Sequence, residues 1–144
     1  MGSLNRAMDI SVTAINAERK HMELISSNIA NVNTTRSIDG GPYRRRIPIY
    51  EEEPVSFEKV LNRAEAKLSG GGVKISDVVE DQSPFQRVYN PSHPDADKYG
   101  FVNLPNVDLS KEMVDMVYTS KLYEANITAY NATKKMMQDT LQIQ

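Results

Sequence analysis

The chain has 144 residues, a quarter of them charged, and a formal net charge of −2 at neutral pH. This near balance excludes a global field that would attract nucleic acid or anionic lipid, and the lack of cysteine excludes disulfides and thiolate metal sites. No apolar run approaches the ~20 residues that span a bilayer, and charged residues such as Asp9 and Glu18 interrupt any signal-peptide-like region. Composition alone therefore predicts one ordinary cytoplasmic domain.

The first 35 residues carry the seven-residue apolar repeat of a packed helix. This spacing keeps one seam of a helix facing a partner. We expect the helix to begin near Ser3, a candidate N-cap, and to end near Asn31, where asparagine and β-branched residues follow. The repeat consists of Met1, Met8, Ile15, Met22 and Ile29, with Leu4, Ile25 and Val32 in a second row.

Residues 36–54 have the composition of a turn followed by a strand. The turn is expected at 39–42, where two glycines precede a proline. The segment 43–50 then predicts a strand, which Pro48 directs to the edge of a sheet. We expect the acidic run 51–54 to end that strand as a solvated break.

Residues 55–105 predict one short helix and three strands. A helical stripe of apolar residues runs through 56–68, and the three glycines at 70–72 end it. Strands are expected at 73–79, 85–89 and 100–104. The last two are joined by a loop that holds two prolines.

The last 39 residues repeat the pattern of the first helix. Pro105 closes the middle region, and Asp108 or Ser110 can cap a helix of about 33 residues, roughly 50 Å at 1.5 Å per residue. The apolar row consists of Leu109, Met116, Tyr123, Tyr130 and Met137, flanked by Met113, Ile127 and Leu141.

Charged side chains are scarce in both terminal segments. Residues 36–105 hold 21 charged side chains in 70 residues, whereas the two ends hold 15 in 74. The outer faces of the terminal helices carry alanine, serine, threonine and asparagine instead, which allow close approach on more than one side. The prediction is a mainly α fold with a small β-rich insertion, in which the two long helices pair as an antiparallel-connected coiled coil with neighbours around them.

The sequence holds no catalytic constellation, since it has two histidines, no cysteine and no glycine-rich phosphate loop. Arg44–Arg46 favour solvated or inter-subunit ion pairs over a nucleic-acid site. His93, Asp95 and Asp97 have ligand-like types, but two prolines and high polarity favour an ordinary surface loop. We therefore predict no enzyme activity, no cofactor and no metal.

Asn28 and Asn31 lie on one helix face, at a spacing of three residues. They fit helix termination, in which asparagine tolerates a left-handed residue at the C-terminus. They equally fit hydrogen bonds to neighbouring subunits, and both roles are compatible.

Several strings of the sequence resemble one protein family. Residues 24–35, LISSNIANVNTT, are similar to the N-terminal signature of bacterial flagellar axial proteins, and residues 120–126, SKLYEAN, to the matching C-terminal motif. Residues 39–45, 80–85 and 93–96 further resemble the proximal rod proteins of the FlgC type within the flagellar basal-body rod family. The resemblance covers nearly the whole chain and is weakest at 51–72.

The resemblance implies a structural subunit of the proximal rod, the drive shaft that transmits motor torque across the periplasm. It implies export through the flagellar type III system without a cleaved signal, which replaces the cytoplasmic expectation. Implied partners are copies of itself, other rod proteins of the FlgB, FlgF, FlgG and FliE types, and the export apparatus, with no nucleic acid and no membrane insertion. The rival function is a cytoplasmic coiled-coil adaptor or regulator, which needs only the heptads.

The implied organisation is an inner-tube helix at 1–35, a middle β-rich domain at 36–105 and a second inner-tube helix at 106–144. The residues expected at the assembly interface share the apolar seams and asparagines of the two helices. They are Met8, Ile15, Met22, Ile25, Asn28, Ile29, Asn31, Met113, Met116, Tyr123, Asn126, Ile127, Tyr130 and Met137.

Overall fold

A computed structural model describes residues 2–38, 40–53 and 71–142, and the helix predicted at 56–68 lies outside these residues. Two long helices enclose a small β region in the chain, which confirms the predicted mainly α fold with a β-rich insertion. The elements in order are α1 (Gly2–Ala30), β1 (Arg46–Glu52), β2 (Val73–Glu80), β3 (Gln86–Tyr89), β4 (Phe101–Leu104) and α3 (Leu109–Gln142).

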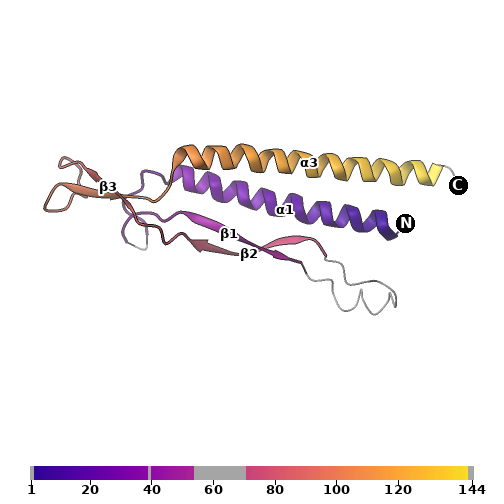
Figure 1. Ribbon diagram of the computed structural model, residues 1–144, viewed down its shortest axis with the longest axis horizontal. Helices are drawn as coiled ribbons and strands as arrows, with labels where there is room; N and C mark the ends of the chain where they lie inside the picture. Colours follow the sequence, from indigo (N-terminus) through magenta and orange to yellow (C-terminus); the bar gives the residue numbers. More distant parts are fainter. Residues whose placement is uncertain (1, 39, 54–70, 143–144) are drawn as a thin grey trace.

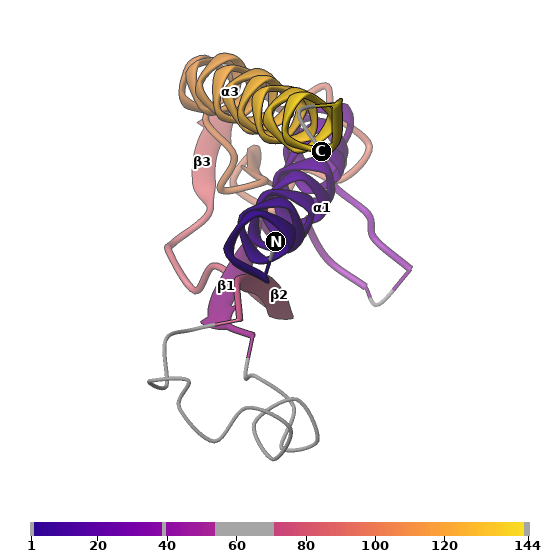
Figure 2. The same ribbon diagram turned by 90° about the vertical axis from the view of Figure 1, so that its right-hand side faces the viewer.

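The two long helices lie side by side and antiparallel, with both chain ends at the same end of the molecule (Figure 1). Strands β1 and β2 run along the other side of α1, and β3 lies beyond the opposite end of the helix pair. Figure 2 shows the resulting order, with α1 between α3 and the β1–β2 ribbon. Among the described elements, α1 contacts α3, β1 and β2, whereas α3 contacts α1 alone.

The local sequence explains both helix ends at the β region. Asn31 directly follows α1, and its side chain braces the turn after the helix: its nitrogen donates to the Ser27 carbonyl and its oxygen accepts from the Thr34 hydroxyl. No described residue other than glycine has a positive φ, so α1 ends without the left-handed asparagine that one of the two interpretations of Asn28 and Asn31 required. At the start of α3, Asp108 Oδ1 accepts from two free backbone N–H groups of the first turn, which makes Asp108 the cap.

The β region consists of two separate antiparallel pairs, β1 with β2 and β3 with β4. Strand β1 continues through Glu52, so the predicted break at residue 51 is wrong. The ladder explains this, because Glu51 pairs with Lys74 and Glu52 with Val73 across the ribbon. A directly opposite charge pair is favourable in an antiparallel sheet.

The end of the β1–β2 ribbon at the start of β2 is hydrogen-bonded to α1. The Thr13 hydroxyl donates to the Ile10 carbonyl and accepts from the backbone N–H of Val73. Gly72 has a φ of +120°, and a Cβ at that position would meet the Thr13 side chain. A glycine is therefore required where the ribbon approaches the helix.

Few apolar side chains are fully buried in the described part of the chain. They are Ala17, Ile25, Tyr43, Val102, Pro105 and Val107. The helices therefore form a long, thin layer rather than the shell of a central core. Within the described residues, no helix is both long enough and apolar enough to cross a membrane.

Candidate functional site: the polar junction and the faces of the helix pair

Asn28 lies near the end of α1 and its side chain is 1% exposed. Its amide nitrogen donates to the backbone carbonyl of Arg46 and to Glu112 Oε2, both at 3.0 Å. Its amide oxygen accepts from the Tyr43 hydroxyl at 2.8 Å and from the Arg46 backbone N–H at 2.9 Å. An asparagine amide offers two donors and two acceptor positions, so all four are used inside the chain.

Glu112 lies in the first turn of α3 and its side chain is completely buried. Its second oxygen, Oε1, accepts from Arg45 Nε at 2.6 Å, which pairs the buried carboxylate with a cation. Arg45 also lies 3.4 Å from Asp115 Oδ2 and 4.0 Å from Asp81 Oδ2. Removing one partner from such a pair leaves a buried charge uncompensated.

Asn106 connects this network to the segment between β2 and β3. Its side-chain oxygen accepts from the Arg45 backbone N–H, and its nitrogen donates to the backbone carbonyls of Asp81 and Ser83. Hydrogen bonds from Ser83 and the nearby positive charge of Arg45 lower the pKa of Asp81. We call Asn28, Tyr43, Arg45, Asn106 and Glu112 the polar junction.

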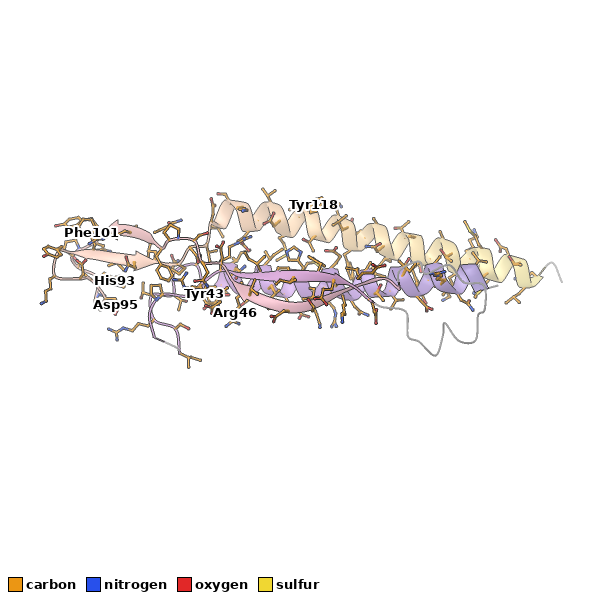
Figure 3. The ribbon with its side chains drawn as sticks, turned by 60° about the horizontal axis from the view of Figure 1, so that its bottom comes forward. Tyr43, Arg46, His93, Asp95, Phe101 and Tyr118 are labelled. Carbon is orange, nitrogen blue, oxygen red and sulfur yellow. The ribbon has the colours of Figure 1, made fainter. Side chains whose placement is uncertain are left out.

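The polar junction lies where the helix pair meets the β region, and Figure 3 shows Tyr43 at that place. Arg44, beside the polar junction, packs with its guanidinium 4.3 Å from the centre of the Phe85 ring. Arg44 and Arg45 thus contact groups of the same chain, whereas the Arg46 side chain is exposed; ion pairs of these arginines with other subunits stay a prediction. A network with every member hydrogen-bonded specifies a geometry and offers no free reactive group.

A second polar cluster lies one heptad away, where α1, α3 and β1 meet. His21 Nδ1 lies 2.9 Å from the Tyr50 hydroxyl and 3.4 Å from Thr119 Oγ1. Burial lowers the pKa of His21, against the smaller opposite effect of Asp115 and Glu112. Burial, together with the charge of Glu18, raises the pKa of Tyr50 to about 12. Neutral forms of both rings are therefore favoured in the folded chain.

Glu18 completes this cluster on the α1 side. Its Oε2 atom is buried without a hydrogen-bond partner, and burial raises the pKa of the carboxyl group. The sequence offered no signal for this cluster, because Tyr50 and Thr119 are far from the α1 residues in the chain and no member belongs to a motif.

The loop before β4 is held together by ion pairs and hydrogen bonds. Asp95 pairs with Arg36 and accepts from the Thr35 hydroxyl at 2.7 Å, which lowers its pKa, the Thr35 bond contributing most. Asp97 accepts from the backbone N–H groups of Tyr99 and Phe101. Figure 3 places Asp95 and Phe101 at the end of the molecule beyond the helices. No group of potential metal ligands converges in the residues that the structure describes.

The residues predicted for the assembly interface differ in their exposure. Ile25 and Asn28 are buried within the single chain, whereas Met113 is 57% exposed. Their contacts with other subunits stay a prediction, and Asn28 has no amide position left for one. The remaining residues are partly covered: Met8, Ile15, Met22, Ile29, Asn31, Met116, Tyr123, Asn126, Ile127, Tyr130 and Met137.

The outer face of α3 carries large apolar side chains in its first three turns. Met113, Val114, Val117 and Tyr118 are 57–68% exposed. Figure 3 places Tyr118 on α3, along the side of the molecule away from β1 and β2. We call these four residues the outer apolar face; contiguous exposed apolar surface of this kind marks an interaction site.

Flagellar protein families match both ends of the chain. The family described as "Flagella basal body rod protein" matches residues 8–36, and the family described as "Flagellar basal body rod FlgEFG protein C-terminal" matches residues 98–143. The chain is 43% identical over 143 residues to the flagellar basal-body rod protein FlgC of Bacillus subtilis, with 95% of each chain covered. It is 40% identical to FlgC of Borreliella burgdorferi, with 95% of each covered, and 34% identical to FlgC of Aquifex aeolicus, with 99% of this chain and 98% of that protein covered.

Proposed function

Because this chain belongs to the flagellar basal-body rod protein family, we propose that it is a proximal-rod subunit whose helix pair packs side by side with its neighbours. Its relatives, similar over nearly the whole length, are FlgC-type rod proteins, so it is a structural rod subunit of the flagellar basal body and not an enzyme. The alternative function, a cytoplasmic adaptor, has no support. It would account only for the heptads, whereas the similarity to rod proteins extends over nearly the whole chain.

The outer apolar face of α3 carries the proposal of side-by-side packing. One face of α3 packs on α1, while Met113, Val114, Val117 and Tyr118 face outward with large apolar side chains. The opposite side of α1 is already covered by the β1–β2 ribbon. A neighbour docking on the outer apolar face would contact a different surface of its own, and such heterologous contacts generate open helical assemblies.

The finer parts of the function follow from this packing. The two helices pair as a coiled coil, and the predicted interface residues that the single chain leaves partly or well exposed line contacts in the rod wall; the buried Ile25 and Asn28 do not. Stiffness then comes from many parallel helices, each burying apolar area at about 25 cal/mol per Å². In this way the proximal rod transmits motor torque across the periplasm.

The proposed neighbours are copies of this chain and rod proteins of the FlgB, FlgF, FlgG and FliE types. The chain reaches the periplasm through the flagellar type III export apparatus, without a cleaved signal peptide. The family membership supports both statements.

The test replaces one outward valine by aspartate in a bacterium that lacks its own copy of the gene. Val117→Asp is expected to abolish swimming and to leave isolated basal bodies without an assembled rod, because a buried carboxylate at a subunit contact is unpaired. The matched control is Val88→Asp, the same change at a 42% exposed valine on β3. We expect the control to swim.

Two further measurements separate assembly from folding and export. The purified Val117→Asp chain should unfold at the same denaturant concentration as the unchanged chain, and it should still be found outside the cytoplasm in cell fractions. Normal swimming of the Val117→Asp strain would overturn the packing proposal. Retention of the unchanged chain in the cytoplasm of motile cells would overturn the export proposal.

A further inference from the structure

The apolar rows of α1 and α3 do not by themselves select one alignment of the two helices. Each helix repeats its large apolar residues every seven positions, so a slide of one heptad, about 10 Å at 1.5 Å per residue, replaces one such residue by the next. The helices are joined by residues 31–108, and the extended length of this much chain far exceeds the slide. The repeated rows are Met8, Ile15, Met22 and Ile29 on α1, and Met116, Tyr123, Tyr130 and Met137 on α3.

A second row of residues on α3, also spaced by seven positions, is polar. Each residue of this row differs in size or charge from the one before and the one after it. Two of these residues are buried and contact α1: Glu112 bonds Asn28 at 3.0 Å, and Thr119 lies 3.4 Å from His21. Asn28 and His21 are also one heptad apart, so both contacts belong to one antiparallel register. The row is Glu112, Thr119, Asn126 and Thr133.

A slide of one heptad in either direction breaks the contact between Asn28 and Glu112. In one direction Asn28 faces Thr119, and Glu112 lies beyond the last turn of α1. In the other direction Glu112 faces His21, and Asn28 faces chain that precedes α3. Each slide leaves a buried amide or carboxylate without its partners, which is unfavourable.

The segment 43–46 contacts both helices at the same place. Tyr43 and the Arg46 backbone bind Asn28 on α1, while Arg45 binds Glu112 on α3. A slide of α3 would therefore also separate Arg45 from the carboxylate that it neutralises.

We propose that the polar junction sets the register of α1 against α3. The His21–Thr119 contact, one heptad away, favours the same register. The apolar seam supplies attraction without choosing an alignment. A buried polar group that fixes register is the best-attested role of such groups in paired helices. The inference concerns the single chain and does not depend on the proposed function.

Engineered cysteine pairs measure the register directly, because the chain has no cysteine of its own. Extending the observed register by one heptad places Ala14 opposite Asn126. A slide of one heptad instead places Ala14 opposite Thr133, or Ala7 opposite Asn126. A disulfide requires Cα atoms about 4.4–6.8 Å apart, so a slide of about 10 Å changes which of these three pairs closes.

The test compares disulfide formation by the three cysteine pairs in the dilute, full-length chain, read by mass spectrometry of digested peptides. In the unchanged background, the Ala14→Cys/Asn126→Cys pair should close at least about tenfold more than either slid pair, equivalent to about 1.4 kcal/mol. The junction variant combines Asn28→Leu, Arg45→Met and Glu112→Met. In that variant the slid pairs should rise to within a few-fold of the native pair.

The matched control removes an exposed ion pair by the same chemistry. Lys121 and Glu124 pair at 2.7 Å on the surface of α3, with side chains 71% and 60% exposed. Lys121→Met with Glu124→Met should leave the cross-linking pattern unchanged. If the junction variant does not fold, Glu112→Gln, which keeps the side-chain volume, replaces it with a smaller expected rise of the slid pairs.

A folded junction variant, or a folded Glu112→Gln chain, with the native pattern would overturn the proposal. Equal closing of all three pairs in the unchanged background would do so as well, as would closing of none, because the helices would then not be held in one register.

Discussion

The two long helices share a seven-residue apolar repeat, but the rest of the chain covers them very differently. Helix α1 lies between α3 and the β1–β2 ribbon and holds two of the buried apolar side chains, Ala17 and Ile25. Helix α3 contacts α1 alone among the described elements, and its buried side chains are the polar Glu112 and Thr119. Helices with a similar repeat therefore occupy different positions: α1 is central and α3 is peripheral.

The difference teaches that burial and packing lie mainly on α1, whereas the outward surface lies mainly on α3. Substitutions on α1 should therefore act on the folding of the single chain. Substitutions on the outer apolar face should leave folding unchanged and act on assembly. The polar junction is the exception, because it makes the first turn of α3 as important for folding as α1.

Glu112→Ala should produce the largest loss of stability. It leaves Arg45, whose side chain is 16% exposed, without its nearest anion, and breaking a buried ion pair by removing one partner costs about 3–5 kcal/mol. Urea unfolding of the purified chain measures this loss. A cost below about 1 kcal/mol would mean that Glu112 behaves as a surface carboxylate and that the exception made above for α3 is wrong.

Ile25→Ala compares the core of α1 directly with the outer apolar face. Ile25 is 1% exposed, and replacing a buried isoleucine by alanine costs about 2–5 kcal/mol. Met113→Ala, at a 57% exposed methionine on α3, should change the free energy of unfolding by about 0.5 kcal/mol or less. Equal losses for the two variants would contradict the comparison between the helices.

Gly72→Ala tests how the β1–β2 ribbon covers α1. The φ of +120° is strained for alanine, and the new Cβ would meet the Thr13 side chain, so we expect a cost of about 1–3 kcal/mol. The control is Gly41→Ala, where φ is +89° but no atom lies near the new Cβ. If both variants lose the same stability, backbone strain accounts for the cost and the approach of the ribbon to α1 does not.

The smallest expected effect is a dependence of stability on pH through His21. Burial lowers the pKa of this ring in the folded chain, so below pH about 6.5 the unfolded chain takes up a proton first and stability falls. His21→Gln should reduce the fall in stability between pH 7 and 5. Glu18 acts with the opposite sign, because burial raises its pKa and its desolvation cost is relieved as the pH falls.

Urea midpoints across this pH range, for the unchanged chain, His21→Gln and Glu18→Gln, measure the two contributions. We expect the His21→Gln curve to be flatter than that of the unchanged chain, and the Glu18→Gln curve to be steeper. Parallel curves for all three would show that neither group is desolvated at the α1–β1–α3 contact.

The helices and most strands could be predicted because their signals are local. The heptads and the Asp108 cap belong to single stretches of chain, and the predicted strands at 73–79, 85–89 and 100–104 lie within about a residue of β2, β3 and β4. The end of β1 was predicted wrongly, because Glu51 and Glu52 are held by partners on a strand more than twenty residues away. Local composition carries no information about such a partner.

The candidate site was predictable only in part. Asn28 was singled out, but its role was left between helix termination and contacts with other subunits, and the structure instead uses its amide to join both helices to the segment 43–46. Arg45, Glu112 and His21 were not linked to one another. Their separations of 67 and 98 residues, Arg45 from Glu112 and His21 from Thr119, explain why.

The sequence by itself determined two long amphipathic helices, a small β region between them, and the family to which the chain belongs, because periodicity, capping and motifs are properties of neighbouring residues. Only the tertiary structure decided that α1 lies between α3 and the ribbon, and that Asn28, Arg45 and Glu112 share one buried network. A repeating apolar seam is compatible with several alignments of two helices. The choice among them depends on polar groups that meet only when the chain has folded.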